Sequence, residues 1–223
     1  NWQILPQTRL PNFEFNQLAL NLRFSAKRQL GVFPEQMPNW QWLQNYLADL
    51  SSPLEIFNGF AYTGAASIAA ASQNLQHQVT HLDAAKSSLN WAKANFQLSL
   101  PQNDNIRWIS DDILTFLQRE KKRHHLYDGF ILDPPAFGRA GKTTWKIERD
   151  LPKLLKISSE LLSSNPRFII LSCHHPHLQA ADLAKMLKKM GNLPPGQLEE
   201  FPLTIKAQHG NDLPAGACVR WSR

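Results

Sequence analysis

The sequence predicts an α/β fold with a doubly wound, mostly parallel sheet of seven strands and an N-terminal β-hairpin extension. From Leu54 onward, short apolar runs alternate with helical patterns of about 10 to 15 residues, which is typical of parallel sheets covered by helices. Four of these apolar runs end in glycine or aspartate, as strands that border a ligand site do. A chain of 223 residues with 43% hydrophobic and 19% charged residues has the composition of a globular domain.

Residues 1–33 show the alternation of apolar and polar residues expected of a half-buried hairpin. The alternating apolar residues are Phe13, Phe15, Leu18, Leu20, Leu22 and Phe24. Asn16 and Gln17 lie between the two halves of the pattern and suit a turn. We therefore expect an extension at 1–33, placed as a lid or flank beside a main domain at 34–223.

The main domain divides into strands and helices in a regular order. Strands are expected at 54–58, 78–82, 106–109, 130–132 and 168–171, and two more at 198–205 and 217–221. Helices are expected at 65–71, 84–98, 148–162 and 178–190, and around Trp40 to Leu50 and Ile113 to Leu117. Pro152 is expected in the first turn of its helix, where proline is tolerated.

The chain is basic, with a formal net charge of +6 and a pI of about 9.4, which permits a polyanionic partner. The densest basic run, residues 119–125, suits either such a partner or a solvated helix end. Two cysteines are too few for a disulfide framework and fit a reducing cytosol, so we expect a cytoplasmic protein. No apolar run approaches the roughly 20 residues of a membrane span.

The stretch Tyr127 to Phe137 is the strongest candidate for part of a site. Its apolar residues 130–132 suit a strand buried on both faces, and Asp133, Pro134 and Pro135 follow directly. Two prolines fix φ and lack backbone donors, so the chain must leave the sheet there as a stiff loop. We expect this loop to present Asp133 and the Phe137 ring to a ligand beyond the strand.

Three other strands also end in small or acidic residues. Gly59 and Gly64 flank the first turn, Asp83 follows the second strand, and Asp112 follows the third. Each has a structural alternative, because Gly64 suits close strand–helix packing and the two acids suit helix N-caps. Parallel strands bring their carboxyl ends to one edge, however, and the coincidence of all four favours a nucleotide-like ligand.

The first turn, Gly59 to Gly64, departs from the Gly-x-Gly-x-x-Gly pattern of dinucleotide sites, because Ala61 replaces the glycine that admits a pyrophosphate. A ligand without phosphates therefore fits better than NAD, although an oxidoreductase stays as a rival. Asp83 is placed to bind a ribose diol, and Asp112 to accept from an adenine amino group. That pair suits S-adenosylmethionine as well as any nucleotide. No spacing suitable for a metal site is present, since Cys173 and the histidines after it lie along one backbone run.

These residues resemble the class I S-adenosylmethionine-dependent methyltransferases, specifically the group similar to the large-subunit ribosomal RNA cytosine-C5 enzymes. The resemblance covers roughly residues 31–221 and implies a Rossmann-like fold. Its motifs are Gly31 to Gln36, Phe60 to Gly64, Leu82-Asp83 with Trp91 to Asn95, Asp112 to Leu117, Tyr127 to Gly138 and Val219 to Ser222.

The resemblance implies a role for each residue of the motifs. It implies that Phe60, Ala61, Tyr62, Thr63 and Gly64 cradle the methionine part of S-adenosylmethionine, that Asp83 binds the ribose, and that Asp112 and Ile113 hold the adenine. It further implies that Asp133 lies beside both the methyl group and the target base, that Pro134 and Pro135 shape the base pocket, and that Phe137 stacks on the base. An extruded base loses its stacking partners, and an aromatic ring compensates for that loss.

The target atom stays open at this point. Cytosine C5 becomes nucleophilic only after a thiolate adds to the ring, and Cys173 follows a strand where such a cysteine occurs in the family; a buried structural cysteine is the alternative. A base nitrogen would need no thiolate, and Asp133, His174 or His175 is then a candidate to accept its proton.

We expect an RNA substrate, most simply ribosomal RNA, with the residue 138–146 segment as a basic loop carrying Arg139, Lys142 and Lys146 toward the RNA backbone. A non-catalytic RNA-binding or ribosome assembly factor that keeps the fold is the rival of a different class.

Overall fold

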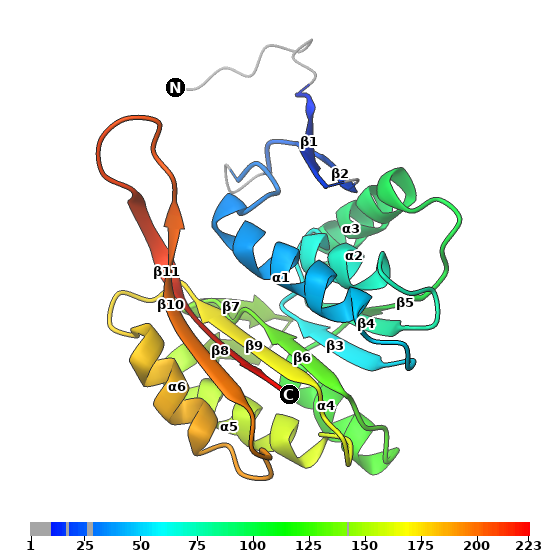
Figure 1. The fold of residues 1–223 in the computed structure, drawn as a ribbon, viewed down its shortest axis with the longest axis vertical. Helices are drawn as coiled ribbons and strands as arrows, with labels where there is room; N and C mark the ends of the chain where they lie inside the picture. Colours follow the sequence, from blue (N-terminus) through cyan, green and yellow to red (C-terminus); the bar gives the residue numbers. More distant parts are fainter. Residues whose placement is uncertain (1–9, 17, 26–28, 142) are drawn as a thin grey trace.

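A seven-stranded sheet forms the centre of the computed structural model, which describes residues 10–16, 18–25, 29–141 and 143–223 (Figure 1). Its strands, in spatial order, are β10 (Gln197–Ile205), β11 (Leu213–Ser222), β9 (Phe168–Cys173), β6 (Gly129–Leu132), β3 (Glu55–Gly59), β4 (Gln78–Asp83) and β5 (Ile106–Ser110). The five strands from β9 to β5 are parallel, and β11 is antiparallel to both of its neighbours. The predicted mostly parallel α/β sheet is confirmed.

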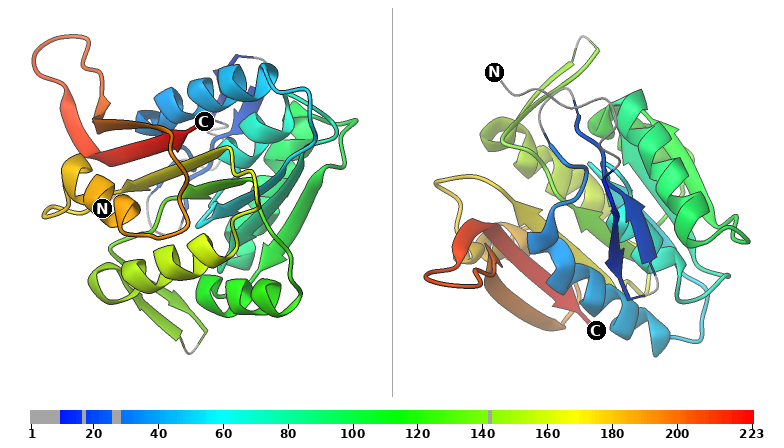
Figure 2. Two further views of the ribbon diagram at one scale, coloured as in Figure 1. Left: turned by 60° about the horizontal axis from the view of Figure 1, so that its bottom comes forward. Right: turned by 90° about the horizontal axis from the view of Figure 1, so that it is seen from above.

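Helices cover both faces of this sheet (Figure 2). The helices α1 (Met37–Ala48), α2 (Ala65–Ala71) and α3 (Lys86–Ser99) lie on one face, and α4 (Ile113–Lys122), α5 (Ile147–Glu160) and α6 (Ala180–Lys188) lie on the other. Successive residues of a strand point to opposite faces, and β9 shows the consequence. Ile169 and Leu171 pack with α4 to α6, whereas Phe168 and Ile170 pack with α1 and α2.

The strand order reverses direction between β3 and β6. From β3 the chain builds β4 and β5 outward on one side, and it then returns to place β6 and β9 on the other side. In open α/β sheets, a crevice forms outside the carboxyl ends of the strands at such a reversal. The loops after β3, β4, β5 and β6 therefore converge on one edge.

The N-terminal extension is the predicted hairpin, formed by β1 (Asn12–Phe15) and β2 (Leu18–Asn21). Its strands are shorter than the alternating pattern, because Leu22 and Phe24 lie beyond β2. The ring of Phe15 meets Trp40 of α1 edge-on with centroids 5.8 Å apart, and the Trp91 indole of α3 donates to the Asn21 carbonyl at 2.8 Å. The hairpin thus packs on the main domain, and the division at residue 33 stays a prediction.

The segment 138–146 is a second hairpin and not the expected loop. Its strands are β7 (Phe137–Ala140) and β8 (Thr143–Lys146), and Gly141 turns the chain with φ of +58°. The buried Trp145 ring anchors β8, and its indole donates to the Pro135 carbonyl at 2.7 Å. Lys142 lies outside the described residues. The expectation for Pro152 is also wrong, because α5 begins at Ile147 and places this proline inside the helix.

The basic run near the end of α4 forms ion pairs with the protein itself. Lys121 pairs with Glu160 at 2.9 Å, and Arg123 pairs with the buried Glu120 at 2.8 Å. Arg119 pairs with Asp111. Since these charges are already compensated, the solvated helix end is the better interpretation of the two.

Candidate active site

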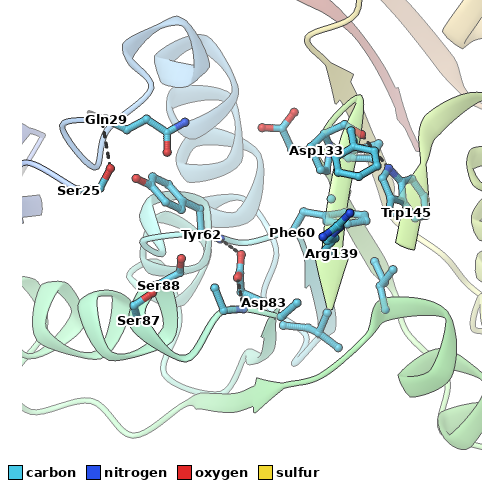
Figure 3. A pocket seen from close by; sticks show the side chains of 18 of the residues that line it. Ser25, Gln29, Phe60, Tyr62, Asp83, Ser87, Ser88, Asp133, Arg139 and Trp145 are labelled. Carbon is cyan, nitrogen blue, oxygen red and sulfur yellow. Dashed lines mark hydrogen bonds between the residues drawn. The ribbon is translucent and has the colours of Figure 1, made fainter. Parts of the chain in front are cut away.

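A cleft of about 870 Å³ opens at the carboxyl edge of the sheet, at the point where the strand order reverses (Figure 3). The sequence-predicted residues that line it are Phe60, Tyr62, Asp83, Asp112, Ile113, Asp133, Pro134, Pro135 and Phe137. Ala61 and Thr63 line a smaller adjoining cavity of about 60 Å³, which Asp133 also borders. Cleft volumes of about 300 to 1,000 Å³ are usual for ligand sites.

The turn after β3 has an unusual backbone. Phe60 and Tyr62 have φ of +58° and +47°, a conformation that costs a non-glycine residue about 1 to 3 kcal/mol. Gly64 follows with φ of +92° as the N-cap of α2, and a Cβ there would lie 3.0 Å from the Ala92 Cβ. Glycine therefore meets two requirements at this position, the left-handed conformation and the close approach of α3.

Asp83 at the end of β4 holds this turn in place. Its carboxylate accepts hydrogen bonds from the backbone N–H of Tyr62 at 2.9 Å and of Ala85 at 2.8 Å. Burial, and secondarily the charge of Asp83, raises the pKa of the Tyr62 hydroxyl. Asp112 caps α4 by accepting from the Thr115 N–H at 2.9 Å, and it also lines the cleft. The N-cap interpretation and the site interpretation of Asp112 are thus compatible.

Asp133 lies between the two halves of the cleft, with Tyr62 and Asp83 on one side and Phe60, Trp145 and Arg139 on the other (Figure 3). Its carboxylate accepts from the Ser172 hydroxyl at 2.7 Å and from the Gln36 amide at 3.2 Å. Burial raises the pKa of Asp133, although the Ser172 hydroxyl, His174 and Gln36 act in the opposite direction. The two donors, Ser172 and Gln36, lie on separate elements and fix the Asp133 carboxylate between the two halves of the cleft.

The half of the cleft beyond Asp133 is aromatic. Phe60 and Trp145 meet edge-on with centroids 4.8 Å apart, and the Trp145 indole holds the Pro135 carbonyl. Phe137 is 54% exposed at the start of β7. The Arg139 guanidinium lies 5.9 Å from the centre of the Phe137 ring. This half can receive a flat ring and an adjacent negative charge.

Cys173 lies apart from the cleft. The pleat of β9 directs Ser172 toward Asp133, and Cys173 belongs to the core cluster of α4 to α6 on the opposite face, with no exposed surface. Burial, and secondarily the charge of Asp133, raises the pKa of the Cys173 thiol to about 11. A nucleophilic thiolate needs a lowered pKa and access. These features count against a nucleophilic role, which stays a prediction to be tested.

Several residues that line the cleft were not selected from the sequence. Arg23, Phe24 and Phe33 come from the segment that joins β2 to α1, and Trp91 comes from α3. His174, which the sequence already indicates as a candidate base, also lines the cleft. The Trp91 ring lies 6.2 Å from Tyr62, and Arg23 lies 5.6 Å above the same ring. Aromatic residues at helical spacing read as core residues, so only the packing of the extension identifies Trp91 as a wall of the site.

The charges of the cleft suit a cation or a set of hydroxyl donors. Four carboxylates line it, those of Asp83, Asp111, Asp112 and Asp133, and Arg119 pairs with one of them. No group of three His, Cys, Asp or Glu suited to a metal ion occurs among the described residues. A nucleoside-type ligand without phosphates fits these acids, as the absence of the middle glycine in the first turn also indicated. Fold and site together define an α/β protein with a cleft that suits such a ligand beside an aromatic pocket.

Comparisons with known proteins agree with this definition. The sequence profile of the S-adenosylmethionine-dependent methyltransferases matches residues 10–185. The structure of the SAM-dependent methyltransferase from Agrobacterium tumefaciens superposes with a TM-score of 0.90 and 31% identity, over 98% of this chain and 72% of that one. The chain belongs to the S-adenosylmethionine-dependent methyltransferase family.

Three further comparisons extend the likeness. The ribosomal RNA large subunit methyltransferase K/L of Pseudoalteromonas atlantica is 32% identical over 67% of this chain, and that of Hahella chejuensis is 32% identical over 65%. This chain spans about a fifth of the length of these relatives, 20% and 19% respectively. The magnesium protoporphyrin IX methyltransferase from Synechocystis, solved with bound SAM, shares the fold with a TM-score of 0.60 at 15% identity, over 85% of this chain and 80% of that one.

Proposed function

We propose that this protein transfers a methyl group from S-adenosylmethionine to a base nitrogen in RNA, with ribosomal RNA as the substrate. The observation that carries the proposal is the position of Asp133, which joins an acidic half of the cleft to an aromatic half. Methyl transfer needs donor and acceptor aligned in one dry cleft, and positioning supplies much of the rate.

The residues of the acidic half fit S-adenosylmethionine. Asp83 would bind the ribose hydroxyls, Asp112 and Ile113 would hold the adenine, and the turn from Phe60 to Gly64 would enclose the methionine part. The carboxylates suit the positive charge of the sulfonium and ammonium groups, and the strained turn is held ready by Asp83. When bound, this cofactor supplies an electrophilic methyl group. The binding roles are part of the proposal.

The residues of the aromatic half would receive the target base. Pro134 and Pro135 shape a rigid wall, since the Trp145 indole fixes the Pro135 carbonyl. Phe137 would stack on a base that has left its helix, and a base–aromatic stack contributes about 1 to 3 kcal/mol. Arg139 beside Phe137 would contact a phosphate, where basic side chains position RNA without reading its sequence.

The positions of the cysteines support a nitrogen acceptor. The sequence has only Cys173 and Cys218, both are fully buried, and neither lines the cleft as the described residues form it. Methylation of cytosine C5 would need a thiolate in contact with the base. A nitrogen with a lone pair needs no such covalent step, so the cleft as it stands can act on it.

The RNA substrate and a cytoplasmic location are supported by the relatives, which are named ribosomal RNA methyltransferases. The formal net charge of +6 suits an RNA partner. Within the described part of the chain, no helix is both long and apolar enough to cross a membrane.

Two measurements test the proposal. Calorimetry with S-adenosylmethionine, S-adenosylhomocysteine and NAD should show binding of the first two only, and binding of NAD alone would favour an oxidoreductase. Labelled donor incubated with ribosomal RNA from a strain lacking this protein should label the RNA, and Asp133→Ala should abolish the labelling. Cofactor binding without transfer to any RNA would favour a non-catalytic assembly factor. Mass spectrometry of the labelled nucleoside then identifies the atom.

A further inference from the structure

His174 follows β9 and lines the cleft together with Asp133. Its side chain is 39% exposed, and its ring lies 5.9 Å from the Phe33 ring. Its Nδ1 atom makes no hydrogen bond to any residue that the structure describes. An imidazole ring that borders the cleft with one nitrogen free of described partners can exchange a proton with a substrate.

Glu35 lies behind this histidine. One carboxylate oxygen, Oε1, lies 3.4 Å from the His174 Nε2, and the side chain is only 4% exposed. The other oxygen, Oε2, is buried and has no hydrogen-bond partner among the described residues. Glu35 borders neither cavity as the described residues form them. A buried carboxylate in this position can act on a substrate through the histidine it faces.

The short 3-10 helix η1 (Pro34–Gln36) connects this pair to Asp133. Gln36 donates to the Asp133 carboxylate at 3.2 Å, and the preceding residue is Glu35 itself. Burial raises the pKa of Glu35, Asp133 raises it further, and a backbone hydrogen bond and His174 act in the opposite direction. A positive charge that forms on His174 would therefore lie near the carboxylates of Glu35 and Asp133, neither of which has a full counter-charge.

We propose that His174 is the catalytic base that removes the proton from the methylated nitrogen, and that Glu35 is the residue that positions it. This inference rests on the proposed function and names its acceptor as a base nitrogen that carries hydrogen. The Nε2 atom of His174 faces the Glu35 carboxylate at 3.4 Å, and this favours the tautomer with the proton on Nε2 and a free lone pair on Nδ1, as a carboxylate does for a catalytic histidine in other enzymes.

The step balances in bonds and protons. The lone pair of the acceptor nitrogen forms the new N–C bond while the C–S bond of the donor breaks and its electron pair stays on sulfur. The N–H bond of the acceptor breaks, its electron pair stays on nitrogen, and the proton moves to Nδ1 of His174. Solvent then removes it from the exposed ring.

The neighbouring His175 is a matched control. Its Nε2 lies 3.0 Å from the Glu148 carboxylate, and its Nδ1 accepts from the His177 N–H at 3.3 Å. Both ring nitrogens are therefore occupied, and His175 is absent from the residues that line the cleft. His175→Gln should behave as the wild type does.

The test compares wild type, His174→Ala, Glu35→Gln and His175→Gln in single-turnover methyl transfer and in S-adenosylhomocysteine binding. General bases contribute about 10² to 10⁴-fold, so His174→Ala should lower kcat by about 100-fold or more while the KM for RNA and the cofactor affinity stay unchanged. Glu35→Gln should lower kcat less and also leave KM unchanged. A His174→Ala rate close to that of wild type would overturn the proposal, as would a product base with a fixed positive charge, because such a product loses no proton.

A second readout does not depend on turnover. Nitrogen NMR of the His174 ring should show the proton on Nε2 in the wild-type protein, and Glu35→Gln should shift or lose this tautomer. A proton on Nδ1 in the wild type would overturn the positioning role. If the wild type transfers no methyl group to RNA, the proposed function fails, and the NMR result still decides whether Glu35 fixes the tautomer of His174.

Discussion

Gly31 offers the sharpest test of how the N-terminal extension supports the cofactor half of the cleft. It has φ of +92°, and a Cβ at this position would lie 2.1 Å from Cζ2 of the Trp91 ring. Its carbonyl also accepts a hydrogen bond of 2.5 Å from the Thr63 hydroxyl, next to the strained turn. Gly31→Ala therefore changes both the backbone and a wall of the cleft.

The expected cost has two parts. A non-glycine residue with positive φ costs about 1 to 3 kcal/mol, and forcing Trp91 out of its position costs about 1 to 3 kcal/mol as overpacking. The variant should lose about 2 to 6 kcal/mol of unfolding free energy. For a domain of this size each kcal/mol lowers Tm by about 2 to 4 °C, so the expected decrease is about 4 to 24 °C.

Gly191→Ala provides the control, because Gly191 has φ of +75° and a Cβ there would meet nothing within 4 Å. It should show only the backbone part, about 1 to 3 kcal/mol. Thermal denaturation measures both variants, and calorimetry measures their affinity for S-adenosylhomocysteine. Gly31→Ala should be less stable than Gly191→Ala and should alone bind the ligand more weakly. Equal Tm values and equal affinities would refute the clash with Trp91.

Three other substitutions test the site and the core. Cys173→Ser should retain methyl transfer, and its complete loss in a folded variant would restore the covalent route. Phe137→Ala should raise the KM for RNA by about 5- to 150-fold, the equivalent of a lost stack of about 1 to 3 kcal/mol, and should leave cofactor binding intact. Glu120→Gln should cost about 3 to 5 kcal/mol of stability, because this buried carboxylate has charged partners. Burial opposes ionisation of Glu120, but hydrogen bonds from partners such as Arg107 and Tyr127 hold its pKa below 4.5. Its stabilisation is therefore complete above pH 4.5 and is lost as pH falls through the lower folded pKa, so denaturation curves of wild type and variant should converge in acid.

The sheet and most of the cleft are predictable because they depend on local patterns. Buried parallel strands read as continuous apolar runs, and the polar residue after each run marks the edge where a ligand binds. Asp83, Asp112 and Asp133 illustrate this, since each follows a strand in the sequence and each lines the cleft. The position of each aspartate after a strand was sufficient to predict that it lines the cleft, because parallel strands bring their carboxyl ends to one edge of the sheet.

Cys173 shows what such patterns leave undetermined. Whether it or Ser172 faces Asp133 depends on the pairing of β6 with β9, in which Leu132 lies beside Leu171. A shift of one residue would exchange the two faces. Register is a property of the folded sheet, so a cysteine near a strand end is a candidate in the sequence, and its role can be assessed only in the structure.

Trp145 shows a different limit. The segment after Phe137 contains glycines and basic residues that are typical of a loop, but it forms a hairpin whose buried indole donates to the Pro135 carbonyl. Tertiary context outweighs local propensity here. The same contact fixes Pro135 at the wall of the cleft, so the error in the predicted secondary structure falls at the candidate site.

Hydrogen bonds join the segments on the two sides of the predicted boundary at residue 33. The Gly31 carbonyl accepts from the Thr63 hydroxyl in the turn from Phe60 to Gly64, which we propose as the cofactor turn. Asn95 of α3 joins both sides by accepting from the Asn21 N–H at 2.9 Å and donating to the Thr63 carbonyl at 2.9 Å. Directly after the boundary, Gln36 holds Asp133. Because the extension and the cofactor turn share these hydrogen bonds, a change that loosens one must loosen the other. Weakened cofactor binding in Gly31→Ala would then report the coupling between the extension and the turn, and not only the steric effect of the added methyl group.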